Sequence, residues 1–376
     1  MFEVLVNTIY PQVLHGGTAR INELTEALVR RWPDSTVHDL ETTLRRHKGS
    51  RRVALLSAWR AALAHVRLSE NPLVLMHYPN LPSVYPFSIK KILAGFIWFP
   101  LFCAALGRWG KKIVISVEDL PLLQYRDLDY SLGVPKRLLA FWERRVFKLV
   151  DEYWFSSRTM ADIQTTHLHL KPQNVRVVKN GCPSVNISSP TSYKRDRIRF
   201  VYAGTLARSR GVEGLLSAFR EVPCPLAELH LCGIDGEWIP HEPFDSRVRY
   251  YGALPAKAAV RVVKNCDVGI IPYPELGYFQ IAYPIKLSLY IASGLSVLST
   301  NLTEPRRVIE EERIGLIVNQ SNLGRQIAWL AEHREEVENW KMKARMAAPR
   351  FTWEGILKEA LADIAATKVR STRRCS

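Results

Sequence analysis

The amino-acid sequence predicts an α/β protein with two Rossmann-like, doubly wound parallel-sheet domains. The chain has 376 residues, more than one hydrophobic core usually holds. Short β-rich apolar runs alternate with longer helical patterns, which is typical of a parallel sheet covered by helices. This alternation stops after residue 185 and restarts near residue 198. We therefore expect two domains facing a central cleft, with ligands bound outside the carboxyl ends of the strands.

The first domain is predicted over residues 1–185. Helical stretches separate its strand-like runs, and the clearest are Ile21–Arg31 and Lys136–Leu149. The predicted strands are Phe2–Val6, Thr36–Leu40, Leu73–His77, Lys112–Val117, Glu152–Phe155 and Val175–Val178. Residues 186–197 lose this periodicity and gather serine, proline and charged residues, so they are the expected linker.

The second domain is predicted over residues 198–350. It opens with the strand-like run FVYAGT and continues with further apolar runs such as DVGIIPY and LSVLST. Its clearest helical stretches are Gly211–Arg220, Ala256–Lys264 and Ile285–Ala292. Residues 351–376 supply a final helix, Trp353–Ala365, and a basic tail.

The charge of the chain indicates an anionic partner. The formal net charge is +16 and the isoelectric point is near 9.7, which suits a nucleic acid, a phosphorylated small molecule or an acidic membrane surface. No nucleic-acid-binding motif accompanies this charge, so we expect no specific nucleic-acid partner.

The cysteines indicate neither a disulfide framework nor a zinc site. All six lie singly, without a CxxC pair, and no histidine cluster has metal-ligand spacing. The N-terminus, MFEVLVNTIY, lacks the pattern of a secretory signal. We therefore expect a cytoplasmic, reducing location and no bound metal.

The apolar segment Ile92–Leu106 has three interpretations. It follows Lys90 and Lys91, contains Pro100, and at 15 residues is shorter than the roughly 20 that span a bilayer. A buried core helix is favoured, ahead of an element that dips into a membrane surface and of a true span. A basic run is either a solvated face or, together with this segment, an anchor on anionic lipid. That run consists of Arg45, Arg46, Lys48, Arg51 and Arg52.

A glycine pair, Gly16 and Gly17, lies between the first predicted strand and a helix, in the run HGGTAR at 15–20. Glycines allow a phosphate to approach the backbone closely, and a helix N-terminus offers unpaired N–H groups. The alternative is a tight turn before the helix. The run is not a GxGxxG fingerprint, so a nicotinamide or flavin cofactor is disfavoured.

Two arginines, Arg208 and Arg210, directly follow the first strand of the second domain, in YAGTLARSRG at 202–211. Guanidinium groups match phosphate oxygens and keep their charge, so the pair can neutralise a diphosphate. The alternative is a solvated loop with surface arginines.

Lys286 occupies the first turn of a helix that Pro284 opens, in PIKLSLYIASG at 284–294. A lysine there opposes the helix dipole, which is unfavourable unless an anion binds between them. The pattern therefore indicates an anion site, and the alternative is a tolerated surface lysine.

With these segments the chain resembles the GT-B glycosyltransferases of glycosyltransferase family 4, the glycosyl transferases group 1. The resemblance covers nearly the whole chain, and its last helix looks like the one that crosses back to the first domain in that fold. It is carried by the glycine pair with Arg20, YAGTLARSRG, VVKNGCP, LHLCG, RVRYYGALP, CDVGIIPY, PIKLSLYIASGLSV and FTWEGILKEAL. KLSLY and VEDLPLLQY look closest to bacterial glucosyl- and galactofuranosyl-transferases that build surface glycans.

The resemblance implies which residues bind the donor. Backbone N–H groups at Gly16 and Gly17 would face the donor phosphates, and Arg210 and Lys286 would lie beside the diphosphate. Such enzymes usually retain anomeric configuration and need no metal, because the cations stabilise the departing nucleoside diphosphate. The remaining expected donor-binding residues are Thr205, Arg208, Tyr251 and Tyr283.

The chain departs from the family pattern at three places. Thr205 stands where much of the family has arginine, and Ile281 and Leu289 stand where two glutamates are frequent, although Glu275 is near in sequence. Glu118, in VEDLP at 117–121, replaces a histidine that contacts the transferred sugar.

Glu118 and the adjacent Asp119 are the candidate catalytic residues. A carboxylate at Glu118 can accept sugar hydroxyls, stabilise positive charge at the anomeric carbon or act as a base toward the acceptor. The alternative is that both residues only end a strand and cap a turn. His77 and Tyr78, at another predicted strand end, are candidates for the acceptor side.

The sequence therefore predicts transfer of a hexosyl unit from a nucleotide sugar, with uridine diphosphate favoured, to a glycan or lipid-linked saccharide. The nucleotide sugar is a co-substrate, and no other cofactor is expected. A homodimer and peripheral attachment to the inner face of the cell membrane stay open. The alternative function is an inactive GT-B partner subunit that binds a nucleotide sugar or membrane and supports another transferase.

Overall fold

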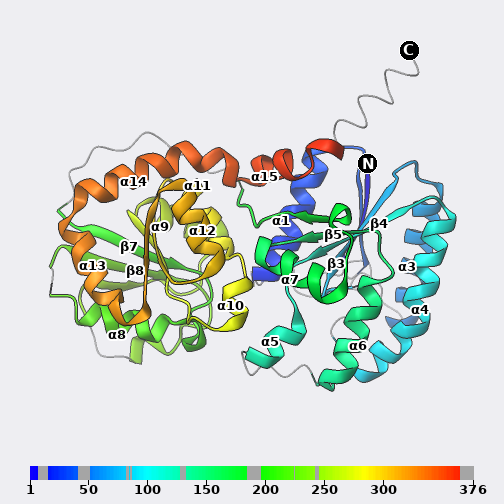
Figure 1. The fold of residues 1–376 in the computed structure, drawn as a ribbon, viewed down its shortest axis with the longest axis horizontal. Coiled ribbons are helices and arrows are strands. Elements are labelled where there is room, and N and C mark those ends of the chain that lie inside the picture. The colour runs from blue at the N-terminus through cyan, green and yellow to red at the C-terminus, as the bar shows by residue number, and fades with distance from the viewer. Residues whose placement is uncertain are drawn as a thin grey trace, which may run out of the picture. The chain divides into compact units, whose positions relative to one another are not determined.

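The computed structural model describes residues 1–6, 16–40, 51–81, 84, 87–127, 133–183, 196–223, 225–241 and 245–364. The chain forms two compact units. The first contains Met1–Lys179 and Ala360–Ser376, and the second contains Asn180–Glu359. The predicted linker at 186–197 lies almost wholly outside the described residues. Figure 1 shows each unit as a sheet covered by helices.

The first unit holds a parallel six-stranded sheet in the order β2-β1-β3-β4-β5-β6. Each predicted strand is present, with ends that differ by at most one residue from expectation. Its strands are β1 (Phe2–Val6), β2 (Thr36–Asp39), β3 (Leu73–Tyr78), β4 (Lys112–Val117), β5 (Glu152–Phe155) and β6 (Val175–Val177). Every residue of β1, β3 and β5 is buried, which explains why they read as continuous apolar runs.

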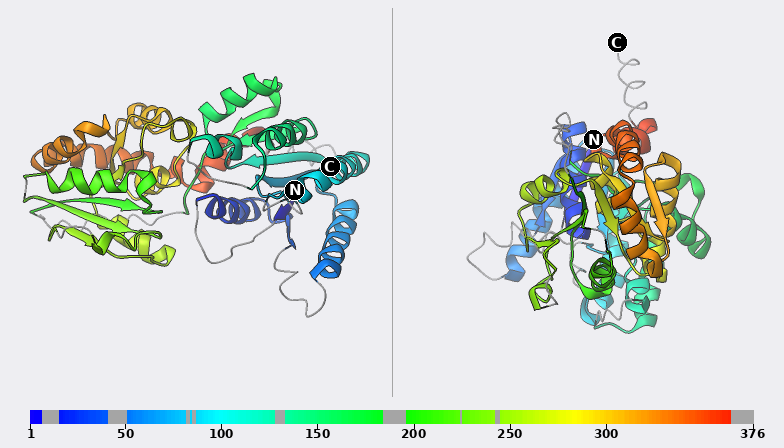
Figure 2. Two further views of the ribbon diagram at one scale, coloured as in Figure 1. Left: turned by 90° about the horizontal axis from the view of Figure 1, so that it is seen from below. Right: turned by 90° about the vertical axis from the view of Figure 1, so that its left-hand side faces the viewer.

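Helices cover both faces of the first sheet, as Figure 2 shows. They are α1 (Gly16–Arg31), α3 (Arg51–Leu68), α4 (Ile89–Arg108), α5 (Pro121–Asp127), α6 (Lys136–Phe147) and α7 (Arg158–Leu168). Trp142 of α6 and Trp154 of β5 are fully buried in the core of this unit. A Cβ on Gly95 of α4 would lie 2.8 Å from Trp142 Cη2, so this glycine permits close packing of α4 on α6.

The apolar segment Ile92–Leu106 lies within α4, a surface helix of the first unit. Among the described residues, α4 alone is long and apolar enough to cross a membrane. In its 18-residue apolar stretch, 33% of the residues are buried. One face packs on α6 and β4. The opposite face exposes leucine and isoleucine, so the observed helix combines a core face with an apolar outer face.

The second unit holds another parallel six-stranded sheet, in the order β12-β11-β10-β7-β8-β9. Its strands are β7 (Ile198–Ala203), β8 (Ala227–Cys232), β9 (Val248–Tyr250), β10 (Val268–Ile271), β11 (Ser296–Thr300) and β12 (Gly315–Val318). Numbered within the unit and read from β9, the order is 3-2-1-4-5-6, that of a dinucleotide-binding fold. The order reverses between β7 and β10, where such sheets bind ligands.

Helices α9 and α11 have the predicted bounds, whereas the last helix, α15, ends at Ala360. Beyond it, Asp363 pairs with Arg176, with 2.6 Å between Oδ2 and Nη2, and both residues belong to the first unit. The helices of the second unit are α8 (Val212–Arg220), α9 (Ala256–Lys264), α10 (Gly277–Ile281), α11 (Ile285–Ala292), α12 (Thr303–Glu312), α13 (Leu323–Glu332), α14 (Arg334–Ala347) and α15 (Trp353–Ala360).

Candidate functional site

Two glycines allow loops to meet at the carboxyl ends of β7 and β8. Gly204 follows β7 with φ of 133°, and Gly233 follows β8 with φ of 153°. A Cβ on Gly233 would lie 1.6 Å from the Gly204 carbonyl oxygen. Only glycine fits there, so the backbone after β7 lies close to its neighbour and directly beside Lys286, whose Nζ is 3.4 Å from the position of a Gly204 Cβ.

Lys286 is a buried cation in the first turn of α11. Its Nζ lies 3.5 Å from the ring centroid of Tyr202 and 4.7 Å from that of Tyr273. Among the described residues Nζ has no hydrogen-bond partner by geometry. Burial lowers the pKa of Lys286 to about 8, and the positive end of the helix dipole adds to the cost of its charge. The position suits a bound anion.

Arg210 joins Lys286 around Tyr273. The Arg210 guanidinium carbon lies 5.8 Å from the Tyr273 ring centroid. Burial would raise the pKa of Tyr273, but Lys286 and Arg210 lower it to about 8. Although burial acts to lower the pKa of Arg210, Tyr273 and Tyr202 hold it above its ordinary value, so the arginine remains charged. Two cations therefore converge on one tyrosine at the switch point of the sheet.

The turn that carries Arg210 is fixed by Gly211. This glycine has φ of 76°, and a Cβ there would lie 1.9 Å from the Pro272 carbonyl oxygen. The turn is thus pressed against the segment that follows β10. Arg210 reaches Tyr273 because these two backbone segments touch.

Arg208 is engaged elsewhere. It forms an ion pair with Glu213, and its guanidinium carbon lies 4.2 Å from the Trp238 ring centroid. Thr205 contributes its backbone carbonyl, which accepts a 2.7 Å hydrogen bond from the Tyr202 hydroxyl. Of the two arginines in the loop, only Arg210 lies with Lys286 and Tyr273.

The first unit carries a second cluster at the carboxyl ends of β3 and β4. His77 Nδ1 lies 2.7 Å from Glu118 Oε1, and Arg20 Nε lies 3.9 Å from the same oxygen. Arg20 Nη2 donates to Ser116 Oγ at 3.3 Å. His77 of β3, Glu118 directly after β4 and Arg20 of α1 are at most 6% exposed, so three ionisable side chains meet in one buried place.

Burial dominates the electrostatics of this cluster. It raises the pKa of Glu118, while His77 and Arg20 act in the opposite direction. Burial also lowers the pKa of Arg20 to about 10, against the attraction of Glu118 and Asp119. Within the described part of the chain, Glu118 Oε2 and His77 Nε2 have no hydrogen-bond partner. Such buried polar atoms are costly unless a ligand satisfies them.

Comparison with known proteins agrees with this geometry. Residues 197–333, most of the second unit, match the family described as glycosyl transferases group 1. The second unit therefore carries a domain of this family. No curated protein matches the chain by sequence.

Solved structures show that the chain has the GT-B fold. Sucrose-phosphate synthase from Thermosynechococcus elongatus superposes with a TM-score of 0.67 at 14% identity, covering 100% of this chain and 99% of that one. Anabaena HepE in complex with UDP gives 0.65 at 14%, covering 97% and 99%. WaaG, a glycosyltransferase involved in lipopolysaccharide biosynthesis, gives 0.62 at 13%, covering 97% and 99%. The predicted fold class is confirmed.

Three tyrosines predicted for the site form hydrogen-bond contacts with other side chains. The Tyr283 hydroxyl lies 3.0 Å from Ser288 Oγ, and the Tyr251 hydroxyl lies 2.9 Å from His230 Nδ1. The hydroxyl of Tyr78 donates to Glu143 Oε2 at 3.0 Å. Tyr78 and Tyr283 are buried, whereas Tyr251 is 40% exposed.

Gly16 and Gly17 lie within the first turn of α1, so the helix begins earlier than the expected Ile21, while His15 lies outside the described residues. Asp119 follows Glu118 and is half-buried. Sequence reasoning did not identify Tyr202 and Tyr273, because tyrosines at strand ends carry no motif of their own. It also placed His77 on the acceptor side without its contact to Glu118.

Proposed function

We propose that the protein is a glycosyltransferase that moves a hexosyl unit from a uridine-diphosphate sugar to a glycan or lipid-linked saccharide. The observation that carries the proposal is the buried Lys286 with Arg210 beside it, at the switch point of a dinucleotide-type sheet. The diphosphate of such a donor would place negative charge beside Lys286 and Arg210. HepE, which shares the fold, has been crystallised with UDP and with UDP-glucose, which favours uridine as the base.

The two cations would act on the leaving group. As the sugar departs, negative charge grows on the nucleoside diphosphate, and fixed cations in a water-poor site stabilise it strongly. Lys286 and Arg210 can do this without a metal ion, so we propose metal-independent transfer. The backbone N–H groups at the start of α1, including Gly16 and Gly17, are proposed to face the donor phosphates.

Glu118 is proposed as the carboxylate that serves the sugar. Its Oε1 is held by His77, and its Oε2 is left for a ligand among the described residues. An ionised carboxylate there can stabilise positive charge at the anomeric carbon or accept a sugar hydroxyl. We propose that Asp119 assists through its charge, and that the transfer retains anomeric configuration.

The variant Lys286→Met tests the donor site, because it removes the charge and keeps most of the side-chain volume. A hydrogen bond to a charged group is worth about 1.5 to 3 kcal/mol, so we expect UDP to bind roughly 10- to 100-fold more weakly. Calorimetric titration of UDP into the full chain measures this change.

Lys257→Met is the matched control, since Lys257 is an exposed lysine on α9 of the same unit. Its UDP affinity should equal that of the unchanged protein. Equal UDP affinity in Lys286→Met and the unchanged protein would contradict the role of Lys286.

A second candidate function is an inactive partner subunit that binds nucleotide without turnover. Ile281, which stands where the family often has a glutamate, is 5% exposed and packs in the core. Neither it nor Leu289 can bind a ribose or sugar hydroxyl. Nucleotide binding without consumption of any donor would support this alternative.

The outer face of α4 and α6 favours a lipid-linked acceptor. The exposed side chains Ile89, Leu93, Ile97 and Leu101 recur every fourth residue along α4. Phe141 of α6 is 62% exposed, and its ring centroid lies 5.2 Å from that of Phe96. We call these five exposed residues, Ile89, Leu93, Ile97, Leu101 and Phe141, the α4–α6 surface.

Exposed basic residues border the α4–α6 surface: Lys90 and Arg108 on α4, and Arg137, Arg144 and Arg145 on α6. Apolar side chains beside lysine and arginine are typical of elements that lie on anionic membranes. We therefore propose that the first unit attaches peripherally to an anionic cytoplasmic membrane face.

A further inference from the structure

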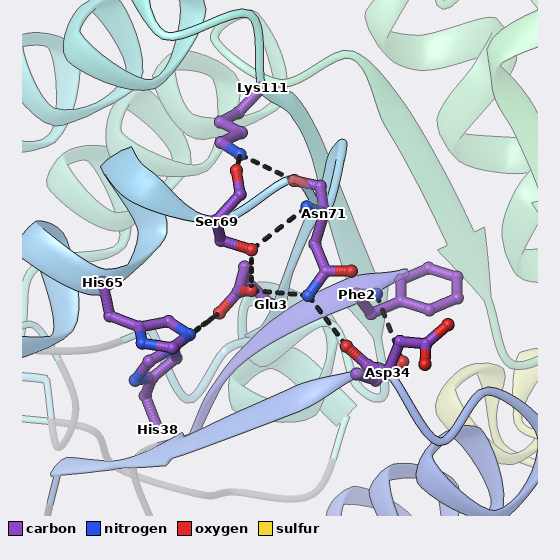
Figure 3. Close-up of polar contacts among 9 residues, drawn as sticks. Phe2, Glu3, Asp34, His38, His65, Ser69, Asn71 and Lys111 are labelled. Carbon is purple, nitrogen blue, oxygen red and sulfur yellow. Dashed lines mark hydrogen bonds and ion pairs between the residues drawn. The ribbon is translucent and has the colours of Figure 1, made fainter.

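Three metal-ligating side chains meet at a place that the proposed transfer reaction does not use. They are Glu3 of β1, His38 of β2 and His65 of α3, and Figure 3 shows them with their neighbours. Glu3 Oε2 lies 2.6 Å from His38 Nε2 and 3.8 Å from His65 Nε2. One ligand atom from each residue lies within 4.8 Å of the others.

This cluster is separate from the His77–Glu118 cluster of the same unit. In the sheet, Glu3 pairs with Val74 of β3, whereas His77 lies three residues further along that strand. At about 3.3 Å per residue, roughly 10 Å of strand separates the two levels. Glu3 therefore lies toward the amino end of the sheet, away from the carboxyl ends that bind substrates in such folds, and His38, which pairs with Leu5, brings its Nε2 to the Glu3 carboxylate.

The Glu3 carboxylate is held in place by neutral donors. Ser69 Oγ and Asn71 Nδ2 donate to Oε1 at 2.6 and 2.7 Å, so Oε2 is the oxygen that faces the histidines. Lys111 Nζ in turn donates to the carbonyls of Ser69 and Asn71. Hydrogen-bonded supports of this kind commonly orient carboxylate ligands of metals.

We propose that Glu3, His38 and His65 form a site for one divalent transition-metal ion, with zinc as the best match. Two imidazoles and a carboxylate are a known zinc donor set, with a fourth position left for water. On a tetrahedral zinc ion such ligand atoms stand roughly 3.3 Å apart, a value between the observed 2.6 and 3.8 Å. For the two pairs that include Glu3, side-chain adjustments of less than about an ångström would reach this spacing.

The ion would have an entry route and a structural effect. The His65 side chain is 52% exposed, whereas Glu3 is fully buried, so the ion approaches from the His65 side. Once bound, it would connect β1, β2 and the last turn of α3. The site thus stabilises the first unit and takes no part in donor chemistry, which remains metal-independent.

The test is a titration of the metal-free full chain with zinc, followed by cobalt as a spectroscopic probe. We expect one equivalent of tight binding, a rise in the midpoint of thermal unfolding and the visible absorption of tetrahedral cobalt. At zinc concentrations about 100-fold above Kd the midpoint should rise by roughly 5 to 10 °C.

The variants His65→Gln and His38→Gln should each weaken zinc binding at least tenfold and abolish the cobalt band. The control is His167→Gln, which removes an exposed histidine of the same unit. His65→Gln changes a half-exposed side chain, so its folding should survive and circular dichroism checks this. Turnover of the donor should not depend on zinc.

Failure to bind one equivalent, or equal binding by His65→Gln and the unchanged protein, would overturn the proposal. The cluster would then be a hydrogen-bonded pair of Glu3 and His38 beside a surface histidine. Neither result depends on whether the protein transfers sugar, so the two proposals fail separately.

Discussion

At the scale of single residues, Lys286 shows how a site is recognised from an unfavourable placement. The position of a lysine in the first turn of a helix is visible in the sequence, and it conflicts with the dipole. The fold adds burial against Tyr202 and the proximity of Arg210, which sequence spacing does not reveal. Whether Arg208 or Arg210 faces the site depends on Glu213 and Trp238, and these partners could not be read from the motif.

Donor binding should weaken above pH 8. In the free protein the pKa of Lys286 is about 8, so its proton is lost as pH rises through that value, while a bound diphosphate keeps the lysine charged. Ionisation of Tyr273, whose pKa is also about 8, adds a negative charge and acts in the same direction. We expect UDP to bind roughly tenfold more weakly at pH 9 than at pH 7, measured by calorimetry.

The variant Tyr273→Phe sharpens this prediction. Tyr273 helps to hold the lysine in its charged form, so its loss should move the decline in UDP affinity to lower pH. An affinity that stays constant between pH 7 and pH 9 in the unchanged protein would contradict the assignment.

Glu118→Gln should separate chemistry from donor binding. The amide keeps the shape of the side chain but cannot carry the negative charge, so kcat should fall about 100-fold or more. UDP affinity should stay within about twofold, because the proposed diphosphate cations belong to the second unit. Steady-state kinetics and calorimetry measure the two effects.

Glu143→Gln is the control for this change. Glu143 carries another buried carboxyl group of the first unit, which accepts a hydrogen bond from the Tyr78 hydroxyl. Burial raises the pKa of Glu143 to about 7. Its kcat should be close to that of the unchanged protein. A similar kcat loss in both variants would mean that Glu118 matters only for folding.

The proposed metal ligands could not be found from a sequence motif, because only the folded chain brings them together. Glu3, His38 and His65 are separated by 35 and 27 positions in the sequence, so the spacing that reveals zinc motifs is absent. Only the parallel pairing of β1 with β2 and the return of α3 place them together. Sequence spacing therefore could not reveal this group of side chains.

At the scale of elements, strands were predictable because buried parallel strands are continuous apolar runs. The predicted strands of the first sheet agree with the observed bounds to within one residue, and α9 and α11 agree fully. α4 was harder to interpret, because its composition suits a buried core helix, which was favoured, as well as an element that dips into a membrane surface and a true span. Its packing against Trp142 through Gly95 and the exposure of its other face distinguish a surface helix.

Membrane binding is the prediction that belongs to α4. The double variant Ile97→Ser with Leu101→Ser removes two side chains that are 71% and 66% exposed, without changing charge. Full burial of one such apolar side chain contributes about 1.5 to 3 kcal/mol to the free energy of membrane binding. The affinity for anionic vesicles should therefore fall at least tenfold. Sedimentation with vesicles of phosphatidylglycerol and phosphatidylcholine measures the bound fraction.

The control is Met342→Ser with Met346→Ser, which removes two exposed apolar side chains of α14 in the second unit. Vesicle binding should be unchanged in that variant. If both double variants sediment like the unchanged protein, the α4–α6 surface is not the membrane contact.

At the scale of the whole molecule, each unit has its candidate residues at the carboxyl ends of its central strands. In the second unit they follow β7 and β10, where the strand order reverses, and in the first they lie at β3 and β4 beside α1, next to the reversal between β1 and β3. The alternation of strands and helices in the sequence predicted the class of both sheets. It did not give the order of the strands, on which the location of both clusters depends.

The most direct measurement is the release of UDP from a panel of UDP-hexoses by the full chain, with Lys286→Met in parallel. We expect at least one donor to be consumed by the unchanged protein, and Lys286→Met to lose that turnover while remaining folded. UDP that binds without any UDP-hexose being consumed would contradict the account and identify the chain as an inactive partner.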